Sequence, residues 1–456
     1  MDPKIFSTYD IRGLYPDQWD KDDARLLGQA FGTFFTKNKV TSVYLGQDNR
    51  QSGPEITKKI SQGLISAGQN VVNLGTIITP MIYFSWYHYQ SPATMMITAS
   101  HNPAGYNGIK SALKKNIIYG DQLQDIKKII KNKDFIKKNQ GKIENKTIAE
   151  KYIDYITKDI KIKKPLRILI DTGNGTTGLF AKKMFEKVGC QTKILFEKSD
   201  GSFPNHPAYP QKEEHYTKMK KELQDNNYNL GLAFDGDGDR IGVYSPEGKF
   251  IENDITAAIF AKKICQNHPG AKIVLNVSTT MAVLETIRAN GGQPILWKTG
   301  FPLITEKMQQ EKAIFGGEIS GHFFFTDRYF GYDDAFYAAL RLLEIISQGP
   351  GIGQLTKELP QYHQIPEFRL KLPQGIDKYQ IGEKIANEIK SEYPSAKVLD
   401  IDGVRFSFEN SWGLLRPSNT EPLLSGRAEG KTKQDLEKIK TIINDKLNKY
   451  QFQQRI

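Results

Sequence analysis

The stretch that decides the fold class is Ile168-Leu-Ile-Asp-Thr-Gly-Asn-Gly175, an apolar β-branched run that ends in small polar residues. Such a run, followed by a helical pattern, indicates a strand and a helix of a parallel α/β sheet. Similar runs occur elsewhere, and we interpret them as buried strands: Val43–Leu45, Met95–Thr98, Leu230–Phe234 and Ile273–Val277. The sequence therefore predicts an α/β protein with mostly parallel sheets.

Three segments share the order strand, polar loop, helix: they begin at Val43, Ile168 and Ile273. Three copies of one α/β module would explain this, and so would the general likeness of such units in any α/β protein; the sequence leaves both explanations open. At about 150 residues per domain, the length alone suggests about three domains. The last part of the chain has a different mixture of strand and helix, ends in the charged helix Thr432–Tyr450, and indicates a small α+β domain.

The composition excludes several classes of protein. The chain has 456 residues and a net charge of +12, but it has no arginine cluster or aromatic RNA-binding signature, so we expect a Lys-rich solvated surface and no nucleic-acid partner. Cys190 and Cys265 form no Cys-x-x-Cys pattern, which favours a reducing, cytoplasmic location. Without an 18-residue apolar run or a signal-peptide pattern, we expect neither membrane association nor secretion. We also expect a monomer.

A first candidate site is Thr98-Ala-Ser-His-Asn-Pro103, which follows an apolar strand. Ser100 should lie just beyond the carboxyl end of that strand, where open α/β sheets bind their ligands. Its hydroxyl can serve as a nucleophile or phosphate carrier, and His101 could orient it or stabilise charge on it. Taken alone, a Ser-His pair is more often part of an ordinary surface loop.

A second candidate is Phe234-Asp-Gly-Asp-Gly-Asp-Arg240. The glycines permit the carboxylates of Asp235, Asp237 and Asp239 to converge, and converging carboxylates repel one another unless a cation neutralises them. Hard oxygen ligands in an open loop suit Mg²⁺. An EF-hand is excluded, because it requires Gly at loop position 6 and Glu at position 12, where this chain has Arg240 and Pro246. The alternative is a solvated acidic turn.

A third candidate is Arg416-Pro-Ser-Asn-Thr-Glu-Pro422. Side-chain and backbone donors in such a loop form a nest that binds an anion, and an arginine can grip a phosphate with two parallel hydrogen bonds. The donors expected here are Arg416, Ser418, Asn419, Thr420 and, a little further on, Arg427. The alternative is a polar turn before a strand.

A fourth candidate is Gly316-Gly-Glu-Ile-Ser-Gly-His322. Glu318, Ser320 and His322 alternate, so an extended loop would direct all three side chains to one side. A carboxylate beside a hydroxyl suits vicinal sugar hydroxyls, and His322 can titrate near neutral pH or pair with a phosphate. Alone, this motif is weak.

Two shorter motifs, Tyr9-Asp-Ile-Arg-Gly13 and Asn107-Gly-Ile-Lys110, add cations near glycine turns. By themselves, Arg12 and Lys110 would be surface charges. In this order along the chain, however, the motifs resemble those of the α-D-phosphohexomutase superfamily, and most of all its phosphomannomutase/phosphoglucomutase branch. The resemblance extends from Ile5 to about Lys440.

The resemblance implies four domains around a central cleft: three related mixed α/β domains and a smaller C-terminal α+β domain. We expect residues 1–155 to carry the phosphoserine loop and residues 156–254 the Mg²⁺-binding loop. The sugar-binding loop is expected in residues 255–365 and the phosphate-binding loop in residues 366–456.

It also implies a role for each motif residue. Ser100 would be the phosphorylated serine, and it would hold Mg²⁺ together with Asp235, Asp237 and Asp239. The groups expected around phosphoryl transfer are Arg12, His101, Lys110, Arg240 and His322. The groups expected to bind the sugar or its non-reacting phosphate are Tyr9, Glu318, Ser320, Arg416, Ser418, Asn419, Thr420 and Arg427.

The implied activity is the interconversion of hexose 1-phosphate and hexose 6-phosphate, with mannose, glucose or both as the sugar. Phospho-Ser100 would donate its phosphate, and hexose 1,6-bisphosphate would serve as intermediate and activator. A phosphoglucosamine mutase is the alternative, although Asn419 stands where that branch has Gly. A non-catalytic phosphosugar-binding protein is another.

Two departures from the pattern motivate the non-catalytic alternative. Bifunctional members resemble this chain but have Lys where Ser278 stands and His where Phe301 stands. Phe301 cannot titrate, so the general base is in doubt. We assign that role to Lys110, whose pKa a site rich in Mg²⁺ and arginine would lower.

Overall fold

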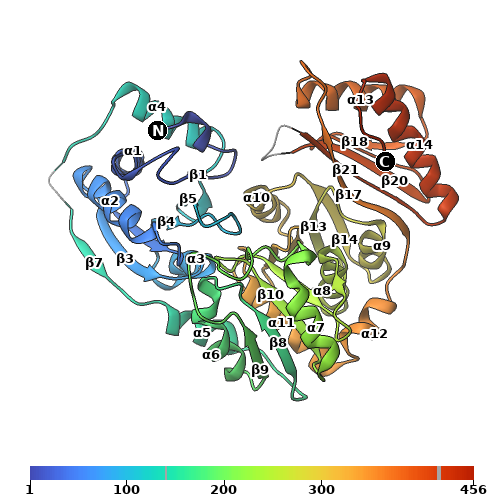
Figure 1. The fold of residues 1–456 in the computed structure, drawn as a ribbon, viewed down its shortest axis with the longest axis horizontal. Coiled ribbons are helices and arrows are strands. Elements are labelled where there is room, and N and C mark those ends of the chain that lie inside the picture. The colour runs from blue at the N-terminus through green and yellow to red at the C-terminus, as the bar shows by residue number, and fades with distance from the viewer. Residues whose placement is uncertain (139–140, 419–422) are drawn as a thin grey trace. The chain divides into compact units, whose positions relative to one another are not determined.

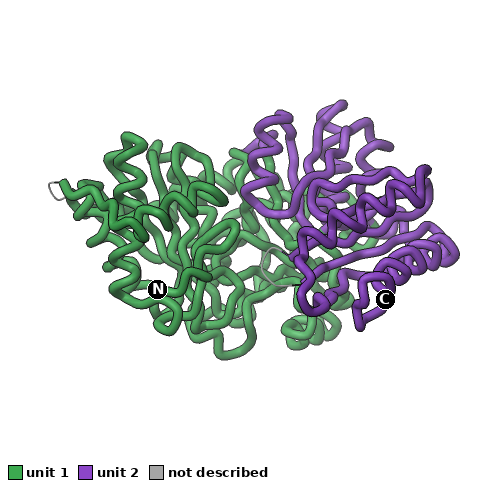
Figure 2. Tube along the Cα trace, turned by 90° about the horizontal axis from the view of Figure 1, so that it is seen from above, with its two compact units in different colours: residues 1–253, 320–325, 330–354 green, residues 254–319, 326–329, 355–456 purple. Residues whose placement is uncertain are grey.

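The computed structural model describes residues 1–138, 141–418 and 423–456 (Figure 1). The chain divides into two compact units (Figure 2). Unit 1 comprises residues 1–253, 320–325 and 330–354, and unit 2 comprises residues 254–319, 326–329 and 355–456. The described residues form three mixed α/β sheets and one C-terminal antiparallel sheet, which confirms the predicted four-domain α/β fold.

The first sheet of unit 1 has the strand order β1-β5-β4-β2-β3-β7, with β6 paired to β5. Its strands are β1 (Ile11–Leu14), β2 (Ser42–Gln47), β3 (Asn70–Thr76), β4 (Ala93–Ile97), β5 (Tyr106–Leu113), β6 (Asn116–Ile117) and β7 (Ile143–Asn145). The helices of this region are α1 (Lys21–Lys37), α2 (Gly53–Ser66), α3 (Thr79–His88), α4 (Asp121–Asn132) and α5 (Ala149–Thr157). Because β2 is parallel to β3 and β4, the loops that follow β2 and β4 both start at the carboxyl ends of the strands, on the same side of the sheet.

The second sheet of unit 1 has the order β12-β11-β10-β8-β9. Its elements are β8 (Arg167–Asp171), α6 (Ala181–Lys187), β9 (Gln191–Leu195), α7 (Thr217–Asp225), β10 (Leu230–Phe234), β11 (Ile241–Tyr244) and β12 (Phe250–Ile251). Two later elements, β16 (Phe323–Phe325) and α11 (Ala335–Gln348), also belong to unit 1. Helix α11 packs on this sheet, where Phe336 stacks on Phe234 with ring centroids 4.5 Å apart.

Unit 2 begins within α8 (Asn253–Asn267). It contains a parallel sheet of order β14-β13-β15 and an antiparallel sheet of order β17-β21-β20-β19-β18. The parallel sheet and its helices are β13 (Lys272–Asn276), α9 (Met281–Ala289), β14 (Gln293–Trp297), α10 (Phe301–Glu311) and β15 (Phe315–Gly317). Helix α12 (Ile352–Lys357) then leads to β17 (His363–Lys371), α13 (Lys378–Glu392), β18 (Lys397–Leu399), β19 (Val404–Ser407), β20 (Ser411–Pro417), β21 (Leu423–Gly430) and α14 (Lys433–Lys449).

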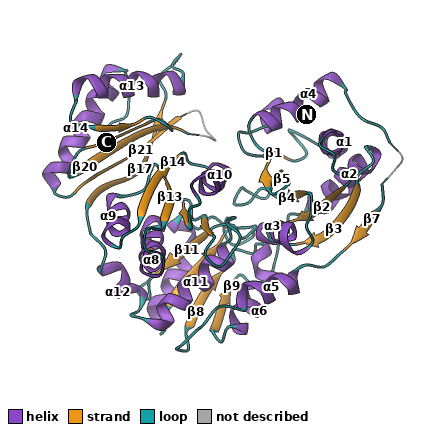
Figure 3. Cartoon of the chain, turned by 180° about the vertical axis from the view of Figure 1, so that it is seen from behind, coloured by secondary structure: helices purple, strands orange, loops and turns teal. Residues whose placement is uncertain are grey.

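The helices α13 and α14 lie together over one face of the antiparallel sheet (Figure 3). Their buried isoleucines, among them Ile385 and Ile443, form one apolar core with Val404 and Leu415 of the strands. The apolar stripe of each helix therefore explains how this small domain closes its core.

The predicted strands match the observed ones closely: Leu230–Phe234 is β10, and Ile273–Val277 overlaps β13. The predicted C-terminal helix is α14. None of the helices in the described residues combines the length and the apolar character needed to cross a bilayer.

Candidate functional site

Ser100 stands in the turn that follows β4 and is fully buried. Its backbone has φ = 50°, a left-handed conformation that costs free energy in a residue with a side chain, so the surroundings must hold it. Its hydroxyl donates to Asp235 Oδ2 at 2.7 Å and lies 3.1 Å from His101 Nδ1. The serine is thus aimed at the carboxylates of the second sheet.

Those carboxylates stand in the turn between β10 and β11. Asp235 Oδ1 accepts hydrogen bonds from three consecutive backbone N–H groups, those of residues 238 to 240, at 3.0–3.1 Å. Gly236 lets the turn approach the serine loop, because a Cβ there would lie 2.7 Å from the carbonyl oxygen of Ser100. Gly238 has φ = 76°, which explains the second glycine.

Lys110 of β5 lies among the same carboxylates. Its ammonium group donates to Asp237 Oδ2 at 2.8 Å and also pairs with Asp239, while Thr79 donates to Asp237 Oδ2 at 2.6 Å. Burial lowers the pKa of Lys110, but the attraction of Asp237 and Asp239 outweighs it and raises this pKa well above its usual value. The carboxylates alone therefore raise the pKa of Lys110, whereas the lowered pKa was predicted for a site that also holds Mg²⁺.

The three aspartates fit a divalent cation. One oxygen from each of Asp235, Asp237 and Asp239 lies within 4.8 Å of the others, and all three residues are buried. Burial, followed by repulsion from Asp239 and Asp237, raises the pKa of Asp235 well above its usual value. Asp237 Oδ1 and Asp239 Oδ1 are buried and accept no hydrogen bond from the described residues. Unsatisfied buried carboxylate oxygens are what a hard cation coordinates.

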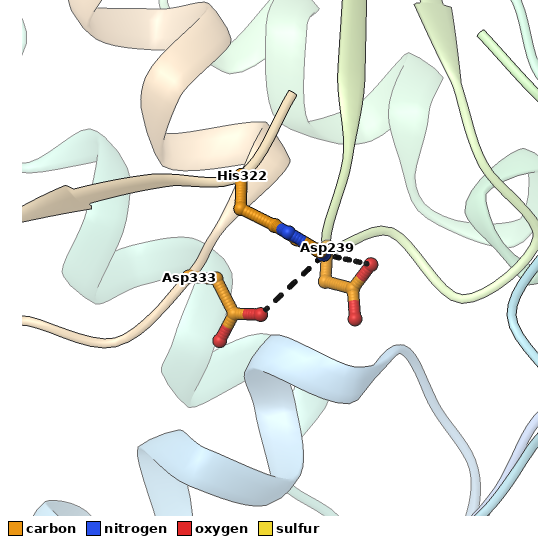
Figure 4. Close-up of side chains that lie close together, drawn as sticks. All are labelled: Asp239, His322 and Asp333. Carbon is orange, nitrogen blue, oxygen red and sulfur yellow. Dashed lines mark ion pairs between the residues drawn. The ribbon is translucent and has the colours of Figure 1, made fainter. Parts of the chain in front are cut away.

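His322 adds a second cluster at the same place (Figure 4). Its Nε2 atom lies 3.5 Å from Asp239 Oδ1 and 3.9 Å from Asp333 Oδ2, and it accepts a hydrogen bond of 3.0 Å from Arg240 Nε. The proton of the neutral ring is therefore on Nδ1, which lies 3.0 Å from Ser320 Oγ. Burial, followed by repulsion from Asp239, raises the pKa of Asp333 to about 7. Asp333 is not among the site residues that the sequence predicted, although the acidic pair Asp333-Asp334 is a local signal for it.

Arg12 and Tyr9 lie at the start of the first sheet. Arg12, on β1, donates to Asn102 Oδ1 of the serine loop at 2.8 Å and pairs with Asp10 at 2.5 Å. The ring of Tyr9 faces that of Tyr119, with centroids 6.3 Å apart. The structure therefore brings Arg12 to the serine loop and gives Tyr9 an aromatic neighbour.

His101 lies against Tyr209, with ring centroids 4.4 Å apart. Burial lowers the pKa of His101 well below its usual value, and the positive charges of Arg240 and Arg12 act in the same direction. A neutral His101 beside Ser100 is the consequence near pH 7.

The segment that follows β15 differs from the prediction. Residues 319 and 320 form a turn, so the expected extended loop that directs Glu318, Ser320 and His322 to one side is wrong. Ser320 and His322 belong to unit 1, whereas Glu318 belongs to unit 2. Within unit 2, Glu318 is buried and accepts the backbone N–H of Gly300 at 2.7 Å.

The predicted phosphate-binding loop lies in unit 2. Arg416, on β20, donates from Nε to Asp402 Oδ2 at 3.0 Å, and the same oxygen accepts the backbone N–H of Thr299 at 2.9 Å. The carbonyl oxygen of Ser418 accepts a hydrogen bond from Lys378 at 2.6 Å. Asn419 and Thr420 lie outside the described residues.

Arg427, on β21, is buried and held by its neighbours. It donates to Asp254 Oδ2 at 2.6 Å, to the carbonyl oxygen of Ser278 at 3.0 Å and to Gln364 Oε1 at 2.8 Å. A phosphate would have to compete with Asp254 for this guanidinium, so a phosphate-binding role for Arg427 stays a prediction. Ser278 follows β13, and Phe301 begins α10.

Comparison with known proteins decides the family. Four models of the phosphoglucomutase/phosphomannomutase family match the chain: alpha/beta/alpha domains I, II and III at residues 3–137, 150–248 and 252–363, and the C-terminal domain at residues 369–446. A phosphoglucomutase of Neisseria gonorrhoeae is 38% identical over 437 residues, which are 95% of each chain. The chain belongs to the phosphoglucomutase/phosphomannomutase family.

Two further relatives support the same family assignment. A phosphomannomutase/phosphoglucomutase of Pseudomonas aeruginosa is 36% identical over 97% of this chain and 95% of that protein. The crystal structure of a phosphoglucomutase/phosphomannomutase family protein from Burkholderia thailandensis superimposes with a TM-score of 0.92 at 34% identity, covering 99% of this chain and 98% of that one. The resemblance noted in the sequence is therefore confirmed, and the chain is a phosphohexomutase-family enzyme.

Proposed function

We propose that this protein interconverts hexose 1-phosphates and hexose 6-phosphates, with glucose, mannose or both as the sugar, through a phosphate carried on Ser100. The observation that carries the proposal is the 2.7 Å hydrogen bond from Ser100 Oγ to Asp235, inside a buried cluster of three aspartates and Lys110. A serine whose oxygen points into a cation-binding cluster is suited to bear and release a phosphoryl group.

In the forward step, the bond between phosphorus and Ser100 Oγ breaks while a new P–O bond forms to the free hydroxyl of the bound sugar phosphate. The hydroxyl gives up its proton, and Ser100 Oγ leaves with the electron pair of the broken bond. The product is a hexose 1,6-bisphosphate, which reorients and returns its other phosphate to Ser100 by the reverse step. The two steps together move a phosphate from one end of the sugar to the other.

We assign the acceptance of the hydroxyl proton to Nε2 of His322 instead of Lys110. Nε2 carries a lone pair, which in this structure accepts the hydrogen bond of Arg240, so Arg240 must release Nε2 and turn to the phosphate before Nε2 can take the hydroxyl proton. Lys110 is already paired with two carboxylates. We assign the positive charges of Lys110, Arg240 and Arg12 to the stabilisation of the transferring phosphoryl oxygens. A neutral His101 beside Ser100 can hold the loop without competing for these oxygens.

Asp235, Asp237 and Asp239 would hold Mg²⁺ together with an oxygen of the Ser100 phosphate. When bound, the ion would neutralise the negative charge that three carboxylates and a phosphate bring together. In unit 2, we assign Glu318 to sugar hydroxyls and Arg416, Ser418, Asn419 and Thr420 to the non-reacting phosphate. Tyr9, Ser320 and Arg427 complete the proposed substrate-binding residues.

The proposal is tested by a coupled assay with Mg²⁺ and hexose 1,6-bisphosphate over four substrates: the 1-phosphates of glucose, mannose, glucosamine and N-acetylglucosamine. We expect turnover of glucose 1-phosphate, mannose 1-phosphate or both, and intact-mass measurement should find one phosphate on Ser100. A preference for glucosamine 1-phosphate would favour the amino-sugar alternative. No turnover and no phosphate would favour a non-catalytic phosphosugar-binding protein.

A further inference from the structure

Arg50 lies just after β2, outside every motif that carries the proposed function, and its side chain is completely buried. All five N–H groups of its guanidinium are used. Nε donates to Asp48 Oδ2 at 3.2 Å. The remaining four donate to backbone carbonyl oxygens: those of Ser100 at 2.8 Å, Asn102 at 2.6 Å and Pro103 at 2.7 Å in the serine loop (Thr98–Pro103), and that of Tyr106, the first residue of β5, at 2.9 Å.

Three of these contacts hold a loop that contains neither helix nor strand between β4 and β5, and the fourth ties the same guanidinium to the start of β5. These carbonyl groups converge on one planar ion, and their relative positions are therefore fixed by the rigid geometry of that ion. Among them is the carbonyl of Ser100, whose backbone is in the unfavourable left-handed region. A lysine could not replace Arg50, because a single ammonium group with three donors cannot reach four carbonyl oxygens that surround a planar guanidinium.

Arg50 is itself held in place from two sides. Asp48 Oδ1 accepts the backbone N–H of Arg50 at 2.9 Å, so one carboxylate binds both the main chain and the side chain of the arginine. The ring of Phe203, from the segment between β9 and α7, lies 5.1 Å from the guanidinium carbon. The ion is therefore oriented before any substrate arrives.

We infer that Arg50 is a positioning residue for phosphoryl transfer: it fixes the serine loop so that Ser100 Oγ faces Asp235. Arg50 acts through the backbone of the loop and through no group assigned to the substrate. The inference rests on the proposed function. If Arg50 served stability alone, its replacement would change the melting temperature without changing the activity of the molecules that remain folded.

The test is Arg50→Lys, with Arg341→Lys on α11 as the matched control. Arg341 is also buried and also lies over an aromatic ring, that of Phe325 at 4.7 Å, and it donates to the hydroxyl of Tyr337 on its own helix at 3.2 Å. With glucose 1-phosphate, we expect kcat of R50K to fall about 100-fold, because a misplacement of about 1 Å can cost this much. KM should stay within about threefold, since the groups assigned to the sugar and its phosphate are untouched. R341K should keep its kcat.

A second readout follows the serine directly. Intact-mass measurement after mixing with hexose 1,6-bisphosphate gives the rate at which Ser100 gains its phosphate, scaled to the folded fraction from circular dichroism. This rate should fall with kcat in R50K. A folded R50K with wild-type kcat and a wild-type phosphorylation rate would overturn the inference, as would a rise in KM alone.

If R50K does not fold, Asp48→Asn takes its place, because the amide keeps the size of Asp48 and weakens its hold on the guanidinium. We expect its kcat to fall about tenfold at unchanged KM, and a wild-type kcat in folded D48N would overturn the inference. The wild-type protein in the same assay separates the two claims. An inactive wild type without phosphoserine rejects the proposed function and this inference together, whereas an active wild type beside an equally active R50K rejects the inference alone.

Discussion

The two units treat their charges differently. In unit 1, three buried aspartates lie together, Lys110 pairs with two of them, Asp237 and Asp239, and two of the carboxylate oxygens accept no hydrogen bond from the described residues. In unit 2, Arg416 is matched by Asp402 and Arg427 by Asp254. The first arrangement has negative charge in excess and suits a cation with a phosphoryl group. The second is balanced, which keeps arginines oriented until an anion competes for them.

The largest effect should come from removing the hydroxyl of unit 1. Ser100→Ala is expected to lower kcat at least about 10⁴-fold, because it removes the oxygen to which the transferred phosphate is assigned. Calorimetry should still detect glucose 1-phosphate binding. Ser61→Ala, a buried serine of α2 that donates to the carbonyl of Thr57, is the control and should keep its activity. Near-wild-type turnover of S100A with bisphosphate present would contradict the assignment of Ser100 as the phosphate carrier.

A smaller loss is expected from the balanced charges of unit 2. Arg416→Ala should lower kcat/KM about 10²–10³-fold, which corresponds to the loss of two charge-assisted hydrogen bonds to phosphate. Intact mass should still show phosphate on Ser100, because that reaction is assigned to unit 1. Arg288→Ala, an exposed arginine in the last turn of α9, is the control. Loss of the phosphoserine in R416A would contradict this division of roles.

Asp402 tests whether the partner of Arg416 orients it or competes with the phosphate. Asp402→Asn should raise KM about three- to tenfold with kcat within about twofold, since the amide loosens both Arg416 and the N–H of Thr299. The double variant with R416A should be no worse than R416A alone, as expected when two groups act through one contact. A lower KM in D402N would show competition instead.

The smallest effect concerns stability. Burial would raise the pKa of Glu388 on α13, but hydrogen bonds from Lys449, Tyr450 and Lys446 on or next to α14 lower it to about 2. A carboxyl group whose pKa is lowered by folding stabilises the fold above its unfolded pKa of about 4.3, and this stabilisation is lost as the pH falls from there toward 2. Glu388→Gln should therefore lower the melting temperature by about 2–4 °C at pH 7, with a smaller gap from the wild type near pH 3. Activity at pH 7 should not change; a pH-independent gap would contradict the assignment.

The strands and the candidate loops could be predicted because their signals are local. A short apolar run such as Leu230–Phe234 predicts a strand. Three aspartates separated by glycines predict a turn in which the carboxylates converge. The pairing of Ser100 with Asp235, 135 positions away, has no local signal. Only the resemblance to a family joined the two motifs before the structure did.

The residues that were missed or misjudged share one property: their partners are distant in sequence. From the local sequence, Arg50 is interpreted as an ordinary polar residue in a loop. Its four carbonyl partners lie about 50 positions further along the chain. The pKa of Lys110 was expected to be low, but Asp237 and Asp239, which raise it, lie 127 and 129 positions away. The monomeric state, the cytoplasmic location, the central cleft and the exact domain boundaries stay predictions.

By itself, the sequence determined the α/β class, the C-terminal change of domain type and the loops to which we assign the chemistry, because periodicity and motif order are local properties of the chain. The tertiary structure alone decided which charge meets which: Lys110 with two aspartates, Arg427 with Asp254, and Arg50 with the serine loop. The physical reason is that hydrogen bonds and ion pairs depend on separations of a few ångströms, and these separations are set by packing between residues far apart in sequence.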